Sequence, residues 1–517
     1  MTDEQIPDPI TAACRAVRPA GPFDDVAGVR PRFVATPAST AEVSALLRAA
    51  SELGLAVVPR GTGSRLHWGY PPRRCDLVVD MSAMNQVIEH AAGDLVATVQ
   101  AGVTLERLAE VLGAAGQRLA LDPPAGRRPG GSADGPDGEV TAGTVGGVLA
   151  TGVTGPLRFR YGSPRDLLLG ITMVRADGTV AKAGGKVVKN VAGYDIGRLL
   201  AGSRGTLGII TEATLRLHPV PGATATVTVE CTAAVEACRL VSAAVESPLT
   251  PVSAELAWPS MNAPAQVAIG LEGDPAGVAA RAAALTDLLN LAGARTADGG
   301  PAGPRGSDAP GEATAPGEPG GPSQAAAGLT GFASAVAATA TGERAGTPAA
   351  GGTGIQVAFW SGDLGMVLAE IRAAALDAGI DPAVSGSAGA GVLDVTLPAA
   401  APADAIAGFV TALRAALGHG LPGQAGHRLA DASPPAMPRP AGAAQPAAGG
   451  QAARPHPTTP RGGPPARANV VIQYAPPGVR DAVDLFGPVP SLALMRAVKQ
   501  QFDPDGILSP GRFAGGI

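Results

Sequence analysis

Two long stretches of this chain cannot form a packed core, and they limit where folded domains can lie. Residues 296–328 and 421–468 consist mostly of glycine, proline and alanine and show no apolar periodicity. Such segments bury too little apolar surface to offset the entropy of ordering the backbone. We therefore expect solvated loops or linkers there, without chemistry of their own.

The remaining sequence predicts two domains and two terminal segments. The expected division is an N-terminal extension over 1–29, a first domain over 30–221, a second over 222–420, the linker over 421–468, and a C-terminal segment over 469–517 that returns to the core. A chain of 517 residues is long enough for each domain to have its own core.

Charge and cysteine content exclude several classes of protein. A net charge of −5 gives no basic field that could neutralise many phosphates, so no nucleic-acid partner is expected. The 4 cysteines show no C-x-x-C spacing and are too few for a disulfide framework or an iron–sulfur module, which suits a reducing cytoplasm. The N-terminus is acidic and no apolar run reaches the length of a membrane span. We expect a cytoplasmic protein, at most peripheral at the inner face of the cell membrane through its partners.

The first domain alternates short strands with helices. The motif STAE at 39–42 forms a capping box that opens a helix. Strand-like runs follow at 55–61, 76–81 and 95–100, and Thr104 can cap the next helix. This alternation predicts an α+β or α/β domain.

The second domain repeats one pattern twice. TATVTVEC, a helix near 233–245 and VSAELAW form the first round of strand, helix and strand. GIQVAFW, a helix near 363–378 and GVLDVTLP form the second. Two such rounds predict a smaller α+β sheet domain of ferredoxin-like type.

A glycine-rich loop, PRGTGSRLHWG, follows the strand that ends near residue 59. It lacks the lysine of a P-loop, and Leu66 stands where a dinucleotide fingerprint needs its third glycine. Glycines permit positive φ and close approach, so consecutive N–H groups can converge on an anion. Taken alone, the loop is equally consistent with a plain connection between a strand and a turn.

A second glycine-rich run, TAGTVGGVLATGVTG at 141–155, contains a predicted helix start. Free amides and the helix dipole favour negative charge there, although a small-residue helix packed on a sheet has the same composition. Two such segments in one domain could hold the two phosphates of a dinucleotide. The region 161–221 adds strands joined by tight glycine turns, among them the hairpin RADGTV.

The order PRGTGS, GTVGG, YGSPRD and KNVAGYD…GSRGTLGIITE resembles the FAD-binding domain of the vanillyl-alcohol oxidase and p-cresol methylhydroxylase (PCMH) superfamily. Within it, LALDPP, the full KNVAGYDIGRLLAGSRGTLG and the terminal KQQFDPDGILSPGRF look like the E subunits of bacterial glycolate oxidases. The resemblance implies an α+β fold: a PCMH-type FAD-binding domain of two subdomains, followed by a smaller cap. It also implies non-covalent FAD, because Ser64 stands where some members carry the histidine that bonds covalently to the flavin.

The family pattern assigns FAD contacts to three segments. The loop amides would hold the pyrophosphate, the helix start would line the other side of the flavin, and a strand would meet the adenine end. The residues so assigned are Pro59, Arg60, Gly61, Thr62, Gly63 and Ser64, then Thr144, Gly146, Gly147, Thr151 and Gly152, then Ile209 and Ile210. His67 is expected to be a surface or packing residue, and no histidine pair on a helix indicates a metal site.

The resemblance implies an FAD-binding subunit of a glycolate oxidase or dehydrogenase complex that oxidises glycolate to glyoxylate. Its partners would be a larger homologous flavoprotein subunit and an iron–sulfur subunit, which receives the electrons. Two alternatives remain: a stand-alone FAD-dependent 2-hydroxy-acid dehydrogenase, and an assembly subunit with weak or no flavin binding.

No catalytic residue is identified from the sequence. The patterned cap region, 222–416, contains no histidine. Arg372 and Arg414 fall on predicted helices and are expected to be solvated. Arg512, in LSPGRF, either approaches the active site or is a charge on the surface.

Overall fold

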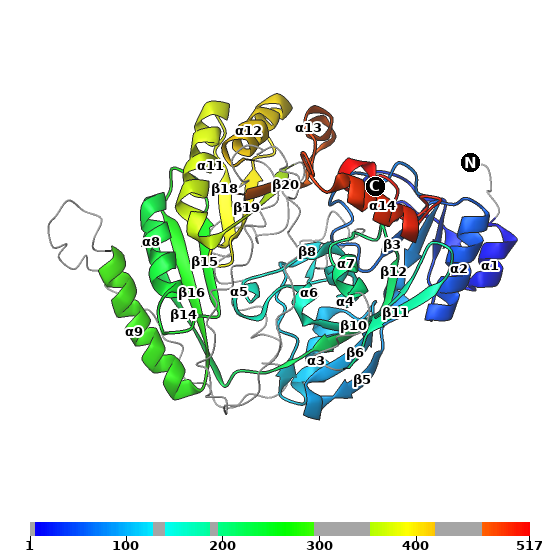
Figure 1. Cartoon of the computed structure of the whole chain (residues 1–517), viewed down its shortest axis with the longest axis horizontal. Helices are drawn as coiled ribbons and strands as arrows, with labels where there is room; N and C mark the ends of the chain where they lie inside the picture. Colours follow the sequence, from blue (N-terminus) through cyan, green and yellow to red (C-terminus); the bar gives the residue numbers. More distant parts are fainter. Residues whose placement is uncertain (1–5, 128–139, 187–194, 294–351, 419–467) are drawn as a thin grey trace, which may run out of the picture.

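The computed structural model describes residues 6–127, 140–186, 195–293, 352–418 and 468–517. The stretch 296–328, the stretch 421–468 except Ala468, and the KNVAGYD motif except Asp195 lie outside these ranges. Figure 1 shows two bodies, an N-terminal domain and a cap, with the C-terminal segment between them.

The first layer of the N-terminal domain is a four-stranded sheet in the order β1-β2-β4-β3. Its elements are β1 (Val17–Pro19), β2 (Phe33–Ala35), β3 (Val57–Arg60) and β4 (Leu77–Asp80), with α1 (Asp8–Ala13) and α2 (Thr40–Glu52). The last three strands run parallel, and β1 pairs antiparallel with β2. Residues 6–29 therefore pack on this domain. The predicted cap of α2 is confirmed, because the Ser39 hydroxyl accepts a hydrogen bond from the Glu42 amide at 3.2 Å.

The second layer is a five-stranded antiparallel sheet in the order β11-β10-β12-β6-β5. Its strands are β5 (Val87–Ala91), β6 (Val96–Gln100), β10 (Leu168–Val174), β11 (Val180–Gly184) and β12 (Ile209–Arg216). The helices of this half are α3 (Leu105–Gly113), α4 (Val145–Thr151), α5 (Arg158–Tyr161), α6 (Pro164–Leu167) and α7 (Ile196–Leu200). Thr104 caps α3 as predicted, and the RADGTV hairpin joins β10 to β11. One apolar core, which includes Leu46, Val57, Leu149 and Ile209, joins both layers.

Short strand pairs connect these layers to their surroundings. They are β7 (Gln117–Arg118) with β13 (His218–Pro219), and β8 (Gly126–Arg127) with β9 (Val140–Thr141). The β7 and β13 pair lies where the chain leaves the N-terminal domain for the cap, because β14 follows β13 directly.

The cap is one seven-stranded antiparallel sheet in the order β14-β16-β15-β18-β19-β17-β20. Its strands are β14 (Ala223–Cys231), β15 (Ser253–Trp258), β16 (Ala265–Gly273), β17 (Thr353–Phe359), β18 (Ala383–Ser387), β19 (Val392–Leu397) and β20 (Ala468–Tyr474). The two predicted rounds are both present and join through β15 and β18. The strand β20, contributed by the C-terminal segment, pairs with β17 at the edge.

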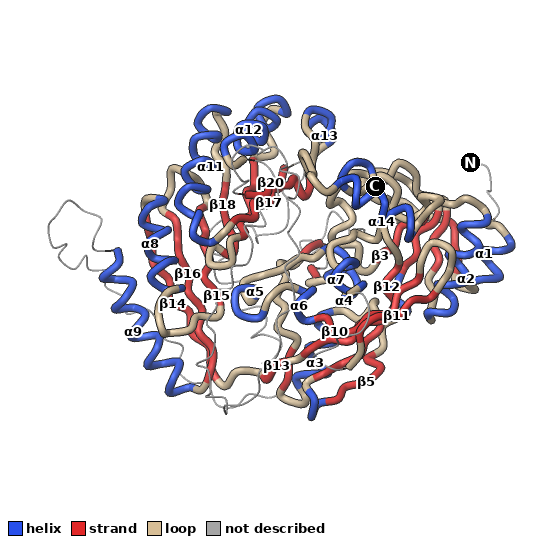
Figure 2. Tube along the Cα trace, in the orientation of Figure 1, coloured by secondary structure: helices blue, strands red, loops and turns tan. Residues whose placement is uncertain are grey.

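Helices cover the face of the cap sheet that is turned away from the N-terminal domain (Figures 1 and 2). They are α8 (Ala234–Val245), α9 (Pro275–Gly293), α11 (Leu364–Ala378) and α12 (Ala403–Ala416). Leu240, Trp258 and Phe409 lie in the core between helices and sheet. The other face carries polar side chains toward the N-terminal domain: Gln473 accepts a hydrogen bond from Arg204, and Glu255 lies within electrostatic range of Asp122.

Arg372 is exposed, as expected, but the prediction that Arg414 is solvated is wrong. Arg414 is buried, and its guanidinium donates hydrogen bonds to the carbonyl oxygens of Val470, Asp484 and Leu485. The reason is long-range: β20 packs beside α12, and the arginine satisfies one carbonyl group within that strand and two beyond it.

The C-terminal segment ends on the N-terminal domain. It forms α13 (Pro477–Ala482) and α14 (Leu492–Phe502). The Val57 amide then donates to the Ile507 carbonyl, and the Ser509 amide donates to the Val57 carbonyl, both at 2.8 Å. The tail thus extends the first sheet next to β3, immediately before the glycine-rich loop. None of the helices that the structure describes is long and apolar enough to cross a bilayer.

Candidate functional site

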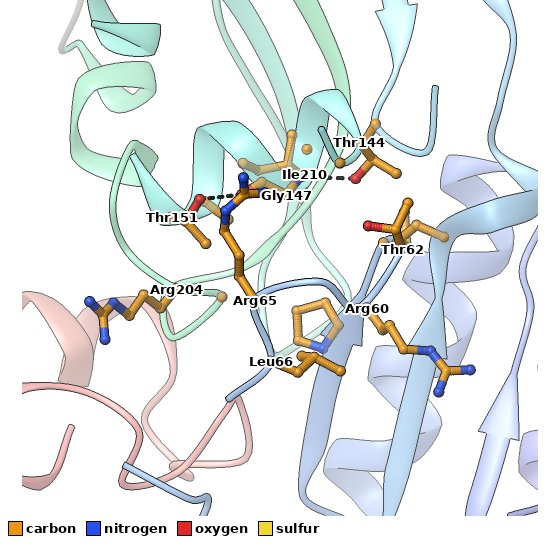
Figure 3. A pocket seen from close by; sticks show the side chains of 18 of the residues that line it. Arg60, Thr62, Arg65, Leu66, Thr144, Gly147, Thr151, Arg204 and Ile210 are labelled. Carbon is orange, nitrogen blue, oxygen red and sulfur yellow. Dashed lines mark hydrogen bonds between the residues drawn. The ribbon is translucent and has the colours of Figure 1, made fainter. Parts of the chain in front are cut away.

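A cavity opens between the end of β3, the start of α4 and the start of β12 (Figure 3). The predicted residues that line it are Pro59, Arg60, Gly61, Thr62, Gly63, Ser64, Thr144, Gly146, Gly147, Thr151, Ile209 and Ile210. Gly152 does not line it. Gly152 ends α4 in the left-handed conformation, with φ of 68°, and its α-carbon faces the backbone of Gly202.

The loop after β3 presents its backbone to the cavity. Gly63 has a φ of 81°, which turns the chain there. Among the residues that the structure describes, the amides of Thr62, Gly63 and Ser64 find no hydrogen-bond acceptor within the chain. The Arg60 side chain points away, because its guanidinium pairs with Asp24 at 2.9 Å and with Asp80 at 2.7 Å. The loop therefore offers unpaired N–H groups, as an anion nest requires.

The start of α4 is less open than the sequence indicated. Its first amides already have partners: Val145 donates to the Val103 carbonyl and Gly146 to the Ala101 carbonyl, each at 2.8 Å. The Gly147 amide donates to the Thr144 hydroxyl at 3.1 Å. The helix start thus forms a wall of the cavity, while the glycine-rich loop supplies the free donors.

Gly61 lets this wall and the loop meet. A Cβ atom at position 61 would collide with the hydroxyl of Thr144, and one at Gly146 would lie 2.8 Å from the Cβ of Ala101. Both positions therefore need glycine, because any side chain would collide with Thr144 or with Ala101.

Three arginines that the sequence analysis did not assign to the cofactor also line the cavity: Arg65, Arg204 and Arg512. Arg65 donates to the carbonyl oxygens of Ala142, at 3.1 Å, and Pro124. Burial lowers the pKa of Arg65 to about 10, so it remains a cation at neutral pH. Figure 3 shows its side chain rising toward the first turns of α4.

Arg512 is not a surface charge. Its side chain is buried, and its guanidinium donates to the carbonyl oxygens of Leu66 and Trp68, so it clamps the far end of the glycine-rich loop. Burial lowers its pKa to about 10. Arg65 and Arg204 lie within the glycine-containing motifs GTGSR and GSRGTLG, which is the one sequence signal that could have indicated them.

His67 is a packing residue, as expected. It lies edge-on to Tyr474 with ring centroids 5.4 Å apart, and its Nε2 is buried with no partner among the described residues. Burial, followed by the charges of Arg65 and Arg512, lowers its pKa to about 4, so the ring is neutral at pH 7. Within the described part of the chain, no histidine, cysteine or carboxylate lines the cavity, and no group of three such side chains is placed to hold a metal ion.

Comparison with known families indicates which cofactor this chain binds. Residues 31–184 match the FAD binding domain family, and residues 485–513 match the FAD linked oxidases, C-terminal domain. This chain carries an FAD binding domain. The predicted α+β fold with a PCMH-type FAD-binding domain and the prediction of FAD as cofactor are thereby confirmed, while its non-covalent attachment stays a prediction. The unpaired loop amides, the glycine contact at Gly61 and the surrounding arginines fit a dinucleotide with a negatively charged pyrophosphate.

Curated relatives match this chain over part of their length. The glycolate oxidase subunit GlcD of Bacillus subtilis is 36% identical over 191 residues, which are 37% of this chain and 38% of that protein. The D-lactate dehydrogenase of Archaeoglobus fulgidus is 37% identical over 186 residues, 36% of this chain and 38% of that protein. The matched region thus spans less than two fifths of either relative.

Solved structures extend the likeness in fold beyond this domain. A structure of alkyldihydroxyacetonephosphate synthase covers 93% of this chain, and the match covers 76% of that protein, with a TM-score of 0.56 and 17% sequence identity. At this identity the comparison concerns the fold alone. It supports the arrangement of the N-terminal domain with a sheet-containing cap.

Proposed function

We propose that this chain is an FAD-dependent oxidoreductase acting on the CH–OH group of a small 2-hydroxy acid. We further propose that it works as the FAD-binding subunit of a glycolate oxidase or dehydrogenase complex. One observation carries the proposal: the cavity combines unpaired loop amides with Arg65, Arg204 and Arg512 and has no acidic lining residue in the described part of the chain. Such a cavity favours an anionic cofactor and an anionic substrate.

The chain's residues have three roles in this proposal. The amides of Thr62, Gly63 and Ser64 bind phosphate oxygens. Arg512 holds the loop in this shape through the carbonyl groups of Leu66 and Trp68. Apolar residues such as Ile209 and Ile210 exclude water from the cavity wall. Bound FAD supplies the hydride acceptor for oxidation of the alcohol carbon.

The electron acceptor must lie on another molecule. The chain has 4 cysteines, and all of them are free and separate in the structure. Because iron–sulfur clusters need sets of cysteine ligands, we propose that electrons leave through an iron–sulfur subunit. A larger homologous flavoprotein completes the proposed complex. We further propose that this subunit lies in the cytoplasm, or peripherally at the inner face of the membrane through these partners. The relative named as a glycolate oxidase subunit supports a multi-subunit assembly.

The test is anaerobic reduction of the purified chain. Bound flavin that glycolate or D-lactate reduces only after the co-expressed partner subunits are added supports the subunit role. Reduction by the isolated chain would show a stand-alone dehydrogenase. Purification of the folded chain without flavin, and with no uptake of added FAD, would leave only the assembly role.

A further inference from the structure

We propose that Arg204, with Arg512 beside it, forms a second anion-binding subsite on the side of the cavity that faces the C-terminal segment. This subsite is separate from the loop amides. Its ligand is a group with anionic oxygens, supplied either by the carboxylate of an acid substrate or by a phosphate of the cofactor. Only the substrate alternative rests on the proposed function.

The backbone fixes where Arg204 stands. Its amide donates to the Ala150 carbonyl at the end of α4 at 2.7 Å, and its φ of 54° is left-handed. This conformation is strained for a residue other than glycine. The chain therefore holds an arginine at a strained position against the cavity wall, between two glycine-containing turns.

The side chain of Arg204 is enclosed by neutral groups. Its guanidinium lies over the rings of Phe486 and Phe513, 5.2 and 5.8 Å from their centroids. Its Nη2 donates to the side-chain oxygen of Gln473 on β20. Its Nη1 is buried and has no partner among the described residues. In Figure 3 the guanidinium points away from Thr62 and Thr144, toward the C-terminal segment.

Arg512 adds a second positive charge without a counter-charge. All of its hydrogen bonds go to carbonyl oxygens, those of Leu66, Trp68 and Tyr70. Neither arginine forms an ion pair with any described carboxylate. Burial and then repulsion by Arg512 lower the pKa of Arg204 to about 9, so both stay cationic at pH 7.

Three other arginines with little solvent exposure have hydrogen-bond or ion-pair partners for their guanidinium groups. Arg60 pairs with Asp24 and Asp80, and Arg118 pairs with Glu272. Arg414 binds only carbonyl groups, but each of its guanidinium nitrogens has a partner and Asp484 lies within electrostatic range.

Arg204 alone of these combines a cavity position with an unsatisfied guanidinium donor. A buried donor left without a partner costs the full desolvation penalty, which an anion in the cavity would remove.

Two variants of the full-length chain test the subsite. Arg204→Met removes the charge but keeps most of the apolar contact with the two rings. Gln473→Glu keeps Arg204 and places a carboxylate beside its Nη2, so an internal ion pair would compete with the ligand. Arg107→Met removes an exposed arginine that is 63% accessible and does not line the cavity, and it serves as the matched control.

Each variant is titrated with FAD and with riboflavin, which lacks phosphate, by flavin fluorescence. The FAD-loaded protein is then titrated with oxalate, and the visible spectrum of the flavin is followed. We expect both Arg204→Met and Gln473→Glu to lower the affinity for one of the two anions, FAD or oxalate, by about 10-fold or more, as loss of a charge-assisted hydrogen bond does. Weaker binding of FAD with unchanged binding of riboflavin identifies the cofactor phosphate as the ligand. Unchanged binding of FAD with weaker binding of oxalate identifies a carboxylate.

The inference is overturned if both variants bind FAD, riboflavin and oxalate as the Arg107→Met control does. A wild-type protein that binds FAD but not oxalate counts against the proposed substrate class. In that case the comparison of FAD binding with riboflavin binding in the variants is the only test of the subsite. Arg204→Lys separates charge from shape: partial recovery of the lost affinity supports an ionic role, and no recovery together with a lowered unfolding midpoint indicates a packing role.

Discussion

The hydroxyl of Thr144 occupies the space that a side chain at Gly61 would need, so the glycine-rich loop and the start of α4 touch through one specific pair. We predict that Gly61→Ala weakens FAD binding by about 10-fold or more, because the new methyl group must push the loop amides or the helix cap out of place. Titration of the apo-protein with FAD measures the effect. Gly93→Ala is the control, since a Cβ there meets nothing within 4 Å.

A double-mutant cycle tests the cause of that loss. Thr144→Ala alone costs about 1 kcal/mol of stability, because the hydroxyl caps α4 by accepting from Gly147. Combined with Gly61→Ala, it should restore part of the FAD affinity, since it removes the colliding oxygen. Strictly additive losses in the double variant would contradict a steric origin at this pair.

FAD should be held without a covalent bond. The lining of the cavity in the described part of the chain contains no histidine, cysteine or tyrosine that could bond to the flavin, and Ser64 follows the loop glycines. Acid precipitation should therefore release the flavin into the supernatant as intact FAD, measured by chromatography. Flavin that stays with the precipitated protein would refute this prediction.

A buried ion pair joins the two domains. Arg118 on β7 pairs with Glu272 on β16, with Nη1 and Oε1 2.9 Å apart, and the Tyr161 hydroxyl donates to the same carboxylate. Arg118→Met leaves that carboxylate buried without a counter-charge, so the free energy of unfolding should fall by about 3–5 kcal/mol. The double variant Arg118→Met/Glu272→Gln should recover most of the lost free energy of unfolding, as measured by urea unfolding.

An exposed pair supplies the comparison. Arg107 and Glu110 lie 3.0 Å apart but are more than 60% accessible, so Arg107→Met should change stability by about 0.5 kcal/mol or less. If the single Arg118→Met variant were as stable as the double variant, the buried pair would not be what links the domains.

Local signals made much of the fold predictable. The caps at Ser39, Thr104 and Thr144 each depend on a side chain and an amide three residues later, so the sequence shows them directly. The strand β18 was missed, because AVSGS has little intrinsic preference for a strand. It is a strand because β15 and β19 pair with both of its edges.

The cavity was only partly predictable for a related reason. The loop amides belong to one short motif, and the sequence places them at the end of a strand. Arg204 and Gln473 are 269 residues apart, and Arg512 reaches Leu66 across 446 residues. No local sequence pattern predicts that an arginine will be buried beside a particular loop. The positive charge of the cavity could therefore be identified only from the tertiary structure.

Glu255 should make stability depend on pH. It lies on β15 with its side chain turned toward the N-terminal domain, is 6% exposed, and its Oε1 has no partner in the described part of the chain. Burial raises its pKa from 4.5 to about 7, so between these values the folded protein holds a proton that the unfolded chain releases. The free energy of unfolding should therefore fall as pH rises through this window and level off above it.

The variant Glu255→Gln isolates this contribution, because it resembles the protonated acid at every pH. At pH 8 it should exceed the wild type in free energy of unfolding by about 3 kcal/mol, and at pH 5 by about 1 kcal/mol or less. Urea unfolding of both proteins between pH 5 and 8 measures the difference. A constant difference across this range would show that Glu255 is ionised in the folded protein throughout, and that its unpaired oxygen is stabilised by a group other than its own proton.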